Sequence, residues 1–252
     1  MKDFHRVLSA ERLKLKRTLV SKIAVLAPVV VVLLVFGVEV VRGGKVSKGD
    51  QPVTDLAQKA FVIWTLLMLP FYASLAAALL AALEHNGDNW KHVLALPVRR
   101  QSIFSAKLIA GGTLLFISSL VWAAAILIAG EVLRLVRPDW SGAALPVVMV
   151  IRGSMLSFCA AGLLFSIQMW ISLRWRNFAL GLGLGIVAII VNILVVSAPT
   201  FVIASFPWFL PAVAIIPHDI GPYRVIGVMW GLLGGIAVGT IACMDLSRRE
   251  FQ

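Results

Sequence analysis

Long apolar runs constrain the fold of this 252-residue chain more than any other feature of its sequence. Six runs approach the ~20 residues that an α-helix needs to cross a bilayer. Hydrophobic residues make up 60% of the chain and charged residues 14%, which excludes the soluble globular classes. The sequence therefore predicts an all-α membrane protein with six transmembrane helices. The predicted spans are approximately Ile23–Val41, Ala60–Leu83, Ile103–Gly130, Ala144–Leu173, Phe178–Ala198 and Val225–Met244.

The first 22 residues form a basic head with the pattern of an amphipathic helix. Its apolar side chains fall on or near one helical face, at Phe4, Val7, Leu8, Leu15 and Leu19. Its basic side chains occupy the remaining surface, at Arg6, Arg12, Lys14, Lys16 and Arg17. This pattern predicts a helix in the plane of the membrane interface that leads into the first span.

The distribution of lysine and arginine predicts the orientation of the chain. With the N-terminus inside, the inner segments hold 15 of the 23 basic residues. Cytoplasmic loops carry such an excess, so we expect a multi-pass plasma-membrane protein with both termini cytoplasmic. The net charge of +11 would suggest nucleic acid in a soluble protein. Here the basic residues sit at the ends of apolar runs, which indicates lipid headgroups instead.

Segment 84–107 lies between the second and third spans and is polar, basic and rich in turn formers. After the turn at Asn86–Asn89, apolar residues recur at helical spacing, at Trp90, Val93, Leu94 and Pro97. Arg99, Arg100 and Lys107 follow, and the sequence predicts that they anchor the chain where it re-enters the membrane. We expect Glu84 to pair with a basic residue of the head or with Arg99 or Arg100.

The pattern of segment 84–107 allows two interpretations. A short amphipathic helix between two spans can lie on the lipid surface, or it can dock into a cytosolic partner.

Between the fifth and sixth spans, prolines interrupt an otherwise apolar stretch. They are Pro199, Pro207, Pro211 and Pro217. We expect segment 199–224 to form broken or re-entrant structure at the outer face, packed against protein because irregular backbone cannot face lipid.

Small residues form ridges along two of the predicted spans. Glycines recur every four residues in the sixth span and once in the fifth, at Gly227, Gly231, Gly235, Gly239, Gly181 and Gly185. Such ridges let helix backbones approach closely. The partner is either another helix of the same chain or a second subunit. The polar residues Asn192 and Gln168, inside spans, are expected to make packing hydrogen bonds rather than to contact substrate.

Motifs of catalysis and cofactor binding were not found in this sequence. There is no nucleotide-binding P-loop, no H-E-x-x-H zinc motif and no nucleophile elbow. We therefore expect no catalytic, metal or cofactor site on this chain. An intramembrane enzyme and a scaffold that recruits a partner without transport remain as alternative functions.

In residue order, these features resemble the membrane permeases of type-2 ABC exporters, and within them the six-span lantibiotic-immunity and bacitracin-resistance permeases. The head carries Glu11-Arg12-x-Lys14-x-Lys16-Arg17, similar to the acidic-then-basic entry of that family. Glu84, Asn89-Trp90-Lys91, Leu94-x-x-Pro97-x-Arg99 and Lys107 resemble its E…T-W-K…L-P…R…K block. Asn89 stands where the family often has threonine or serine.

The resemblance implies an assembly and a role for each cytoplasmic segment. Residues 1–22 would be the connecting helix, and segment 84–107, which includes Arg99 and Arg100, would hold the coupling helix that fits a groove of a separate ATPase subunit. That subunit would bind ATP and magnesium, and two permeases, identical or different, would pair. The substrate would be a peptide antibiotic or a similar hydrophobic compound, exported for self-immunity or resistance.

Overall fold

A computed structural model describes residues 2–16, 18–42, 52–85, 99–137, 144–175, 177–215 and 221–248. Within these ranges every regular element is helical, which confirms the predicted all-α class. The elements are α1 (Lys2–Leu15), α2 (Leu19–Arg42), α3 (Pro52–Ile63), η1 (Trp64–Met68), α4 (Leu69–His85), α6 (Arg100–Val136), α7 (Val147–Ala160), α8 (Gly162–Arg174), α9 (Phe178–Val195), α10 (Thr200–Ser205), α11 (Leu210–Val213) and α12 (Gly221–Arg248).

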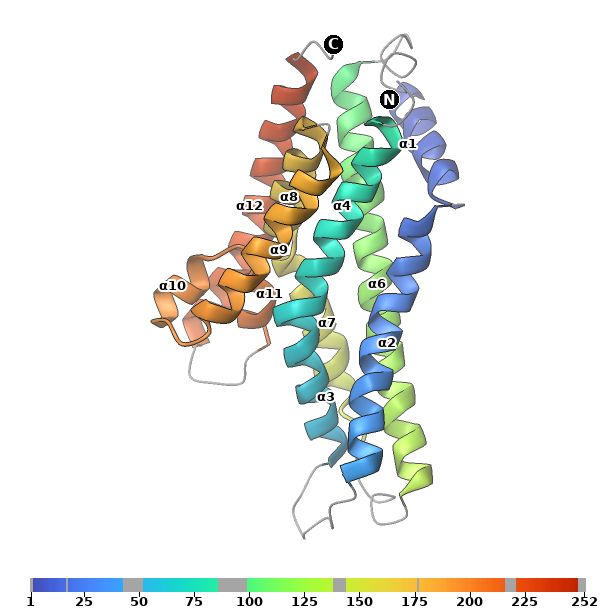
Figure 1. Cartoon of the computed structure of the whole chain (residues 1–252), viewed down its shortest axis with the longest axis vertical. Helices are drawn as coiled ribbons and strands as arrows, with labels where there is room; N and C mark the ends of the chain where they lie inside the picture. The colour runs from blue at the N-terminus through green and yellow to red at the C-terminus, as the bar shows by residue number, and fades with distance from the viewer. Residues whose placement is uncertain are drawn as a thin grey trace.

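Helices long and apolar enough to cross a membrane make up most of the described chain. There are five such helical segments, and α7 with α8 makes a sixth, bent by 40°. The prediction of six spans is therefore confirmed, and the protein is a multi-pass membrane protein. The long helices run side by side, and α1 lies at the same end of the bundle as the start of α6 and the end of α12 (Figure 1). We call this end the α1 end.

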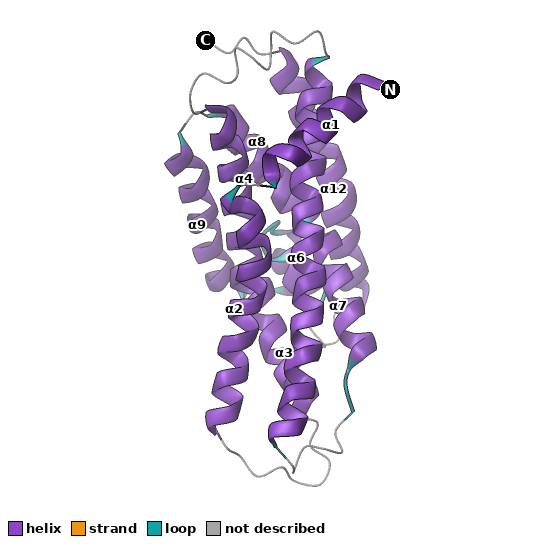
Figure 2. Ribbon diagram, turned by 90° about the vertical axis from the view of Figure 1, so that its right-hand side faces the viewer, coloured by secondary structure: helices purple, strands orange, loops and turns teal. Residues whose placement is uncertain are grey.

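Helix α1 packs across the first turns of α6 (Figure 2). Its inward face buries Glu11 and Leu15, whereas Arg6, Arg12 and Leu13 are exposed. The chain turns into α2 at Thr18, whose hydroxyl donates to the carbonyl of Leu15 at 2.9 Å. The described part of the head is thus a separate helix with one buried and one basic face, as its sequence pattern predicts.

The second span continues through a π-helical turn, η1, between α3 and α4. Pro70 follows this turn and has no N–H, so the carbonyl of Leu66 four residues earlier loses its α-helical donor. Asn192 of α9 donates its Nδ2 hydrogen to that carbonyl at 2.7 Å. Gln168 similarly donates to the carbonyl of Gly181. Both contacts confirm the expectation that these polar side chains make packing hydrogen bonds.

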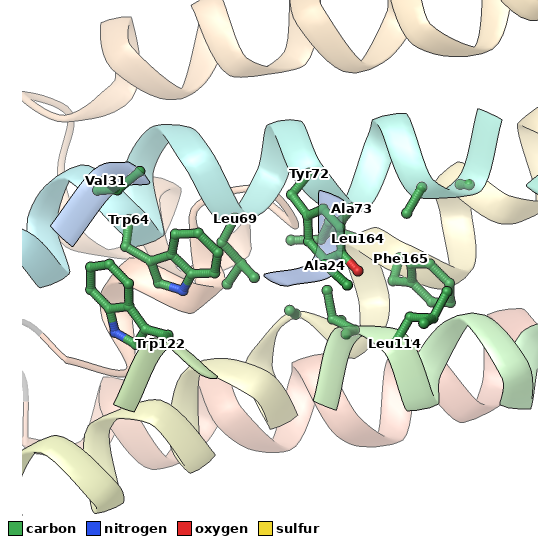
Figure 3. Packing of buried hydrophobic residues seen from close by; sticks show 14 of the residues in the cluster. Ala24, Val31, Trp64, Leu69, Tyr72, Ala73, Leu114, Trp122, Leu164 and Phe165 are labelled. Atoms are coloured by element: carbon green, nitrogen blue, oxygen red, sulfur yellow. The ribbon is translucent and has the colours of Figure 1, made fainter. Parts of the chain in front are cut away.

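Aromatic stacking joins the second and third spans at the centre of the core. The indole rings of Trp64 in η1 and Trp122 in α6 are stacked, with centroids 4.7 Å apart and an 11° interplanar angle (Figure 3). Phe61 meets the Trp122 ring edge-on at 5.8 Å. Further along, Tyr72 and Phe165 continue the buried layer between α4, α6 and α8. These large side chains fix how α4 and α6 sit against each other.

The fourth span, predicted at Ala144–Leu173, is a bent pair of helices rather than one straight helix. It divides into α7 and α8 at Ala161, whose N–H bonds to the carbonyls of Ser157 and Cys159. Gly162 adjoins the break, and glycine is among the residues at which helices bend.

Helix α12 packs against this break through its glycines. A Cβ on Gly231 would overlap the Cα and carbonyl oxygen of Ala160, and one on Gly235 would lie 2.6 Å from the carbonyl carbon of Gly162. The two backbones can approach this closely because neither glycine carries a side chain.

Two short helices, α10 and α11, occupy the proline-interrupted stretch between the fifth and sixth spans. They lie beside the ends of α9 and α12 that are farther from α1 (Figure 1). All four residues of α11 are buried, and α11 packs against α12 and α7. The described part of segment 199–224 is thus broken and held against protein, as the prolines predict.

Candidate functional site

The described ends of segment 84–107 meet at the α1 end of the bundle. Glu84 lies in the last turn of α4, and Arg99 and Arg100 begin α6. Arg99 is the N-cap residue of α6, and both arginines are exposed. The other predicted coupling residues, Asn89, Trp90, Lys91, Leu94 and Pro97, lie outside the described residues, as does Arg17 of the head.

A network of four charged side chains joins α1, α4 and α6 at this end. Lys107 of α6 is at its centre, with its Nζ atom 2.7 Å from Glu84 Oε1 of α4. The same nitrogen lies 3.1 Å from each carboxylate oxygen of Glu11 in α1. A lysine ammonium has three N–H donors, so Lys107 uses all of them within the network.

Lys14 completes the network from the surface side. Its Nζ atom lies 2.8 Å from Glu84 Oε1 and 3.3 Å from Glu11 Oε1. Burial disfavours the charged form of Lys14, but the hydrogen bond that it donates to Glu84 and the charges of both carboxylates outweigh this, so its pKa is raised. Because the ordinary value is already ~10.4, Lys14 keeps its charge throughout the physiological pH range.

Three of the four charged side chains are almost completely removed from solvent, whereas the side chain of Lys14 is 40% exposed. Lys107 and Glu84 are each 1% exposed and Glu11 is 4% exposed. Two carboxylates and two ammonium groups balance in charge, which is the condition under which buried ions are tolerated. Oxygen Oε2 of Glu84 is buried and meets no hydrogen-bond donor in the part of the chain that the structure describes. Glu84 thus retains capacity to accept one further donor.

The network corrects one sequence-based prediction and confirms another. Lys107 was expected to anchor the chain at the lipid surface, but it is buried because α1 folds back over the start of α6 and brings Glu11 to it. The expected pairing of Glu84 with the basic head is confirmed at Lys14.

The roles of Glu11 and Lys107 were missed, although the sequence contains a signal for one of them. Lys107 is flanked by Ala106 and Leu108 within an apolar run, and a charge in such a run is expected to have a partner of opposite sign.

The remaining predicted head residues lie on the outer surface of α1. Arg12 and Lys16 are exposed, as are Arg6 in the same helix and Arg99 and Arg100 at the start of α6.

The predicted glycine ridges contact helices of the same chain. Besides Gly231 and Gly235, a Cβ on Gly181 would lie 2.8 Å from Ser172 Oγ, and one on Gly185 would overlap the Ser74 side chain. At Gly227 the nearest atom would be Val213 Cγ1 at 3.1 Å, and at Gly239 it would be Leu108 Cδ1 at 3.4 Å. These contacts are intrachain packing, and a role of either ridge between subunits remains a prediction.

The geometry defines a class of protein. It is a helical membrane protein whose N-terminal helix α1 is joined by ion pairs to both stems of one polar segment. Residues 7–192 match the family described as ABC-2 family transporter protein. The match covers more than half of the chain, so this protein belongs to the ABC-2 family of transporter proteins. Comparison with curated proteins and with solved structures gave no significant match.

Family membership fixes the general role of the chain. An ABC-2 family protein is the membrane component of an ABC transporter, and catalysis of ATP hydrolysis belongs to an ABC ATPase. The chain is therefore a permease subunit.

Proposed function

We propose that this chain is the permease of an ABC exporter and that a separate ATPase subunit drives it through segment 84–107. The observation that carries the proposal is the ion pair between Glu84 and Lys107, at 2.7 Å, which joins the two stems of that segment. Glu11 and Lys14 attach α1 to the same pair. A force applied to the segment would thus reach α1, α4 and α6 together, as coupling of ATP hydrolysis to helix movement requires.

In this proposal segment 84–107 has two roles: it binds the ATPase, and it passes movement of the ATPase on to the membrane helices. Trp90 and Leu94 would fill a groove on the ATPase, since buried aromatic anchors supply much of the energy of protein interfaces. The buried ion network would transmit the movement to the bundle. ATP and magnesium would be bound by the partner, and two permease chains, alike or different, would complete the transporter.

The proposed substrate is a hydrophobic or amphipathic compound, and we propose a peptide antibiotic. This follows from the sequence resemblance to lantibiotic-immunity and bacitracin-resistance permeases. The membrane-spanning parts of the described helices are largely apolar. Such surfaces suit a hydrophobic compound better than an ion, because an ion would need ionisable side chains along its path. Export of this compound would give the cell immunity or resistance.

Replacing Trp90 by phenylalanine together with Leu94 by asparagine tests the docking role. The double variant keeps an aromatic side chain at the interface, so membrane insertion and abundance should match wild type. The ATPase should no longer co-purify, because about 2 kcal/mol or more of interface energy is lost. Co-purification and substrate-stimulated ATPase activity are measured against expression level.

The matched control is Leu135→Asn, because Leu135 is 77% exposed near the other end of α6. It should leave ATPase binding unchanged. Full ATPase recovery and activity in the Trp90/Leu94 variant would exclude docking through this segment and would favour a helix that only rests on lipid.

The orientation with the α1 end in the cytoplasm is a further prediction. It is supported by the exposed basic residues at that end, among them Arg12, Lys16 and Arg99. In a background with Cys159→Ala and Cys243→Ala, the variants Asp50→Cys and Asp139→Cys should react with an impermeant thiol reagent in intact cells. Asn86→Cys should react only after the cells are opened. Labelling of Asn86→Cys from outside would invert the orientation and remove the docking argument.

A further inference from the structure

A groove of about 670 Å³ runs along the side of the bundle between α6, α8 and α12. Its floor contains small residues, including Gly112, Gly162 and Gly235, and its rims contain large apolar side chains. Ile109 and Ile236 on these rims are exposed, so the groove opens towards the surrounding membrane. It lies apart from the ion network, because α1 contributes no lining residue among those described.

The dimensions of the groove indicate a chain-like occupant. On α6 its lining extends from Gln101 to Leu115, fourteen residue steps or ~21 Å at 1.5 Å per step. The groove is therefore elongated along α6, which suits a chain-like occupant.

The length also corresponds to one leaflet of the bilayer. Half of the hydrocarbon thickness is ~15 Å, and the remaining few ångströms reach the headgroup layer. The groove begins at the α1 end, where Gln101 and Ser105 line it, and ends near the middle of α6 at Leu115. The hydroxyl of Thr240, one helical turn from Met244, is already occupied, because it donates to the carbonyl of Ile236 at 2.8 Å. The polar end thus lies at the membrane surface and the apolar end in its interior.

The charges around the polar end are positive. Arg100 precedes Gln101, Arg248 lies one helical turn beyond the lining residue Met244, and both arginines are exposed. Arg99, the N-cap residue of α6, is also exposed. The nearby carboxylate of Asp245 is neutralised by Arg174 at 2.6 Å. Such surroundings attract an anionic headgroup.

We propose that this groove binds one acyl chain of an anionic phospholipid from the leaflet on the α1 side. The phosphate would lie near the exposed Arg100 and Arg248, and the acyl chain would extend to Leu115. Because Gly162 and Gly235 belong both to the groove and to the α7–α8 bend, a bound lipid would brace the contact of α12 with this bend. The proposal does not depend on the ATPase partner or on the exported compound.

The two cysteines of the chain provide a direct readout, because Cys159 and Cys243 both line the groove. Purified, delipidated protein in detergent is treated with N-ethylmaleimide, with phosphatidylglycerol or phosphatidylcholine added, and modification is followed by intact mass. Phosphatidylglycerol should slow modification about fivefold more than phosphatidylcholine, the preference expected for one arginine at an anionic headgroup. Equal protection by the two lipids, or none, would overturn the proposal.

Variants separate the acyl site from the headgroup site. A Cβ on Gly112 meets no atom within 4 Å, so Gly112→Leu fills the groove without a clash at its own backbone. Retained phosphatidylglycerol, measured by native mass spectrometry, should fall at least about fivefold, because overpacking opposes the ligand there. Gly37 and Gly183 are equally open and lie outside the groove, so Gly37→Leu and Gly183→Leu are the matched controls. Equal loss of lipid in these controls would overturn the assignment.

The headgroup variants decide the proposal even if Gly112→Leu does not fold. Arg100→Gln and Arg248→Gln should each reduce the preference for phosphatidylglycerol over phosphatidylcholine about fivefold, with little change in total lipid bound. An unchanged preference in both would exclude an anionic headgroup at this place. Cross-linking of two chains by a bis-maleimide at Cys159 or Cys243 in membranes would show a second copy in the groove and would also overturn the proposal.

Discussion

Replacing Lys107 by methionine is expected to destabilise the protein by about 3–5 kcal/mol, the cost of breaking a buried ion pair from one side. Methionine keeps the length of the side chain but removes the three donors that bind Glu11 and Glu84. Two buried carboxylates then face each other, with Lys14 as the remaining cation that is seen to contact them. Thermal or denaturant unfolding in detergent, followed by circular dichroism, measures the loss.

Two matched experiments separate the buried network from surface charge. Lys59 pairs with Glu39 at 2.7 Å, and its side chain is 49% exposed. Lys59→Met should therefore cost about 0–1 kcal/mol, as exposed ion pairs do. Adding Glu11→Gln and Glu84→Gln to Lys107→Met removes the unpaired charges and should restore part of the stability. A Lys107→Met protein that unfolds like wild type would show that the network does not hold α1 on the bundle.

The spans could be predicted from the sequence because each rests on a local property of the chain. A run of apolar residues must be helical in lipid, since backbone groups there have no other hydrogen-bond partners. For the same reason the prolines near α10 and α11 correctly predict broken structure. Pro70 is the instructive exception, because the helix continues through it. Asn192, 122 positions further along the chain, donates to the carbonyl that Pro70 leaves free.

Apart from the pairing of Glu84 with the head, the ion network could not be predicted, because it depends on three segments that are far apart in the sequence. Glu11, Glu84 and Lys107 each have the character of a residue at the membrane surface when read alone. They become buried together only because α1 packs across α6. Spacing within a helix predicts which residues share a face, but it does not identify the helix that covers that face.

The same limit applies to the glycine ridge of α12. Its four-residue spacing predicts close packing but leaves the partner open between a helix of the same chain and a second subunit. At Gly231 the partner is the backbone of Ala160, where the fourth span bends. A bend without a proline has no clear sequence signal, so this contact could not be anticipated.

Replacing Gly231 by alanine is expected to destabilise the protein by about 1–3 kcal/mol or more, the cost of overpacking a filled site. The added Cβ would overlap the Cα and the carbonyl oxygen of Ala160, and backbone atoms cannot rotate away as a side chain can. The helices α7 and α12 must then separate, which also opens the packing around Gly162 and Gly235. The measurement is the unfolding midpoint in detergent together with the mass of the purified particle by light scattering.

Gly239→Ala in the same ridge provides the matched control with the opposite sign. Its Cβ would meet Leu108 Cδ1 at 3.4 Å and Ser166 Oγ at 3.5 Å, which are ordinary contact distances. Alanine has the higher helix propensity, by up to ~1 kcal/mol, so this variant should be as stable as wild type or more stable. Because the Gly231 contact is intrachain, Gly231→Ala should lower the midpoint without changing the particle mass. Equal unfolding midpoints for the two variants would show that α12 does not pack closely against the α7–α8 bend. A lower particle mass for Gly231→Ala would place the glycine ridge between subunits.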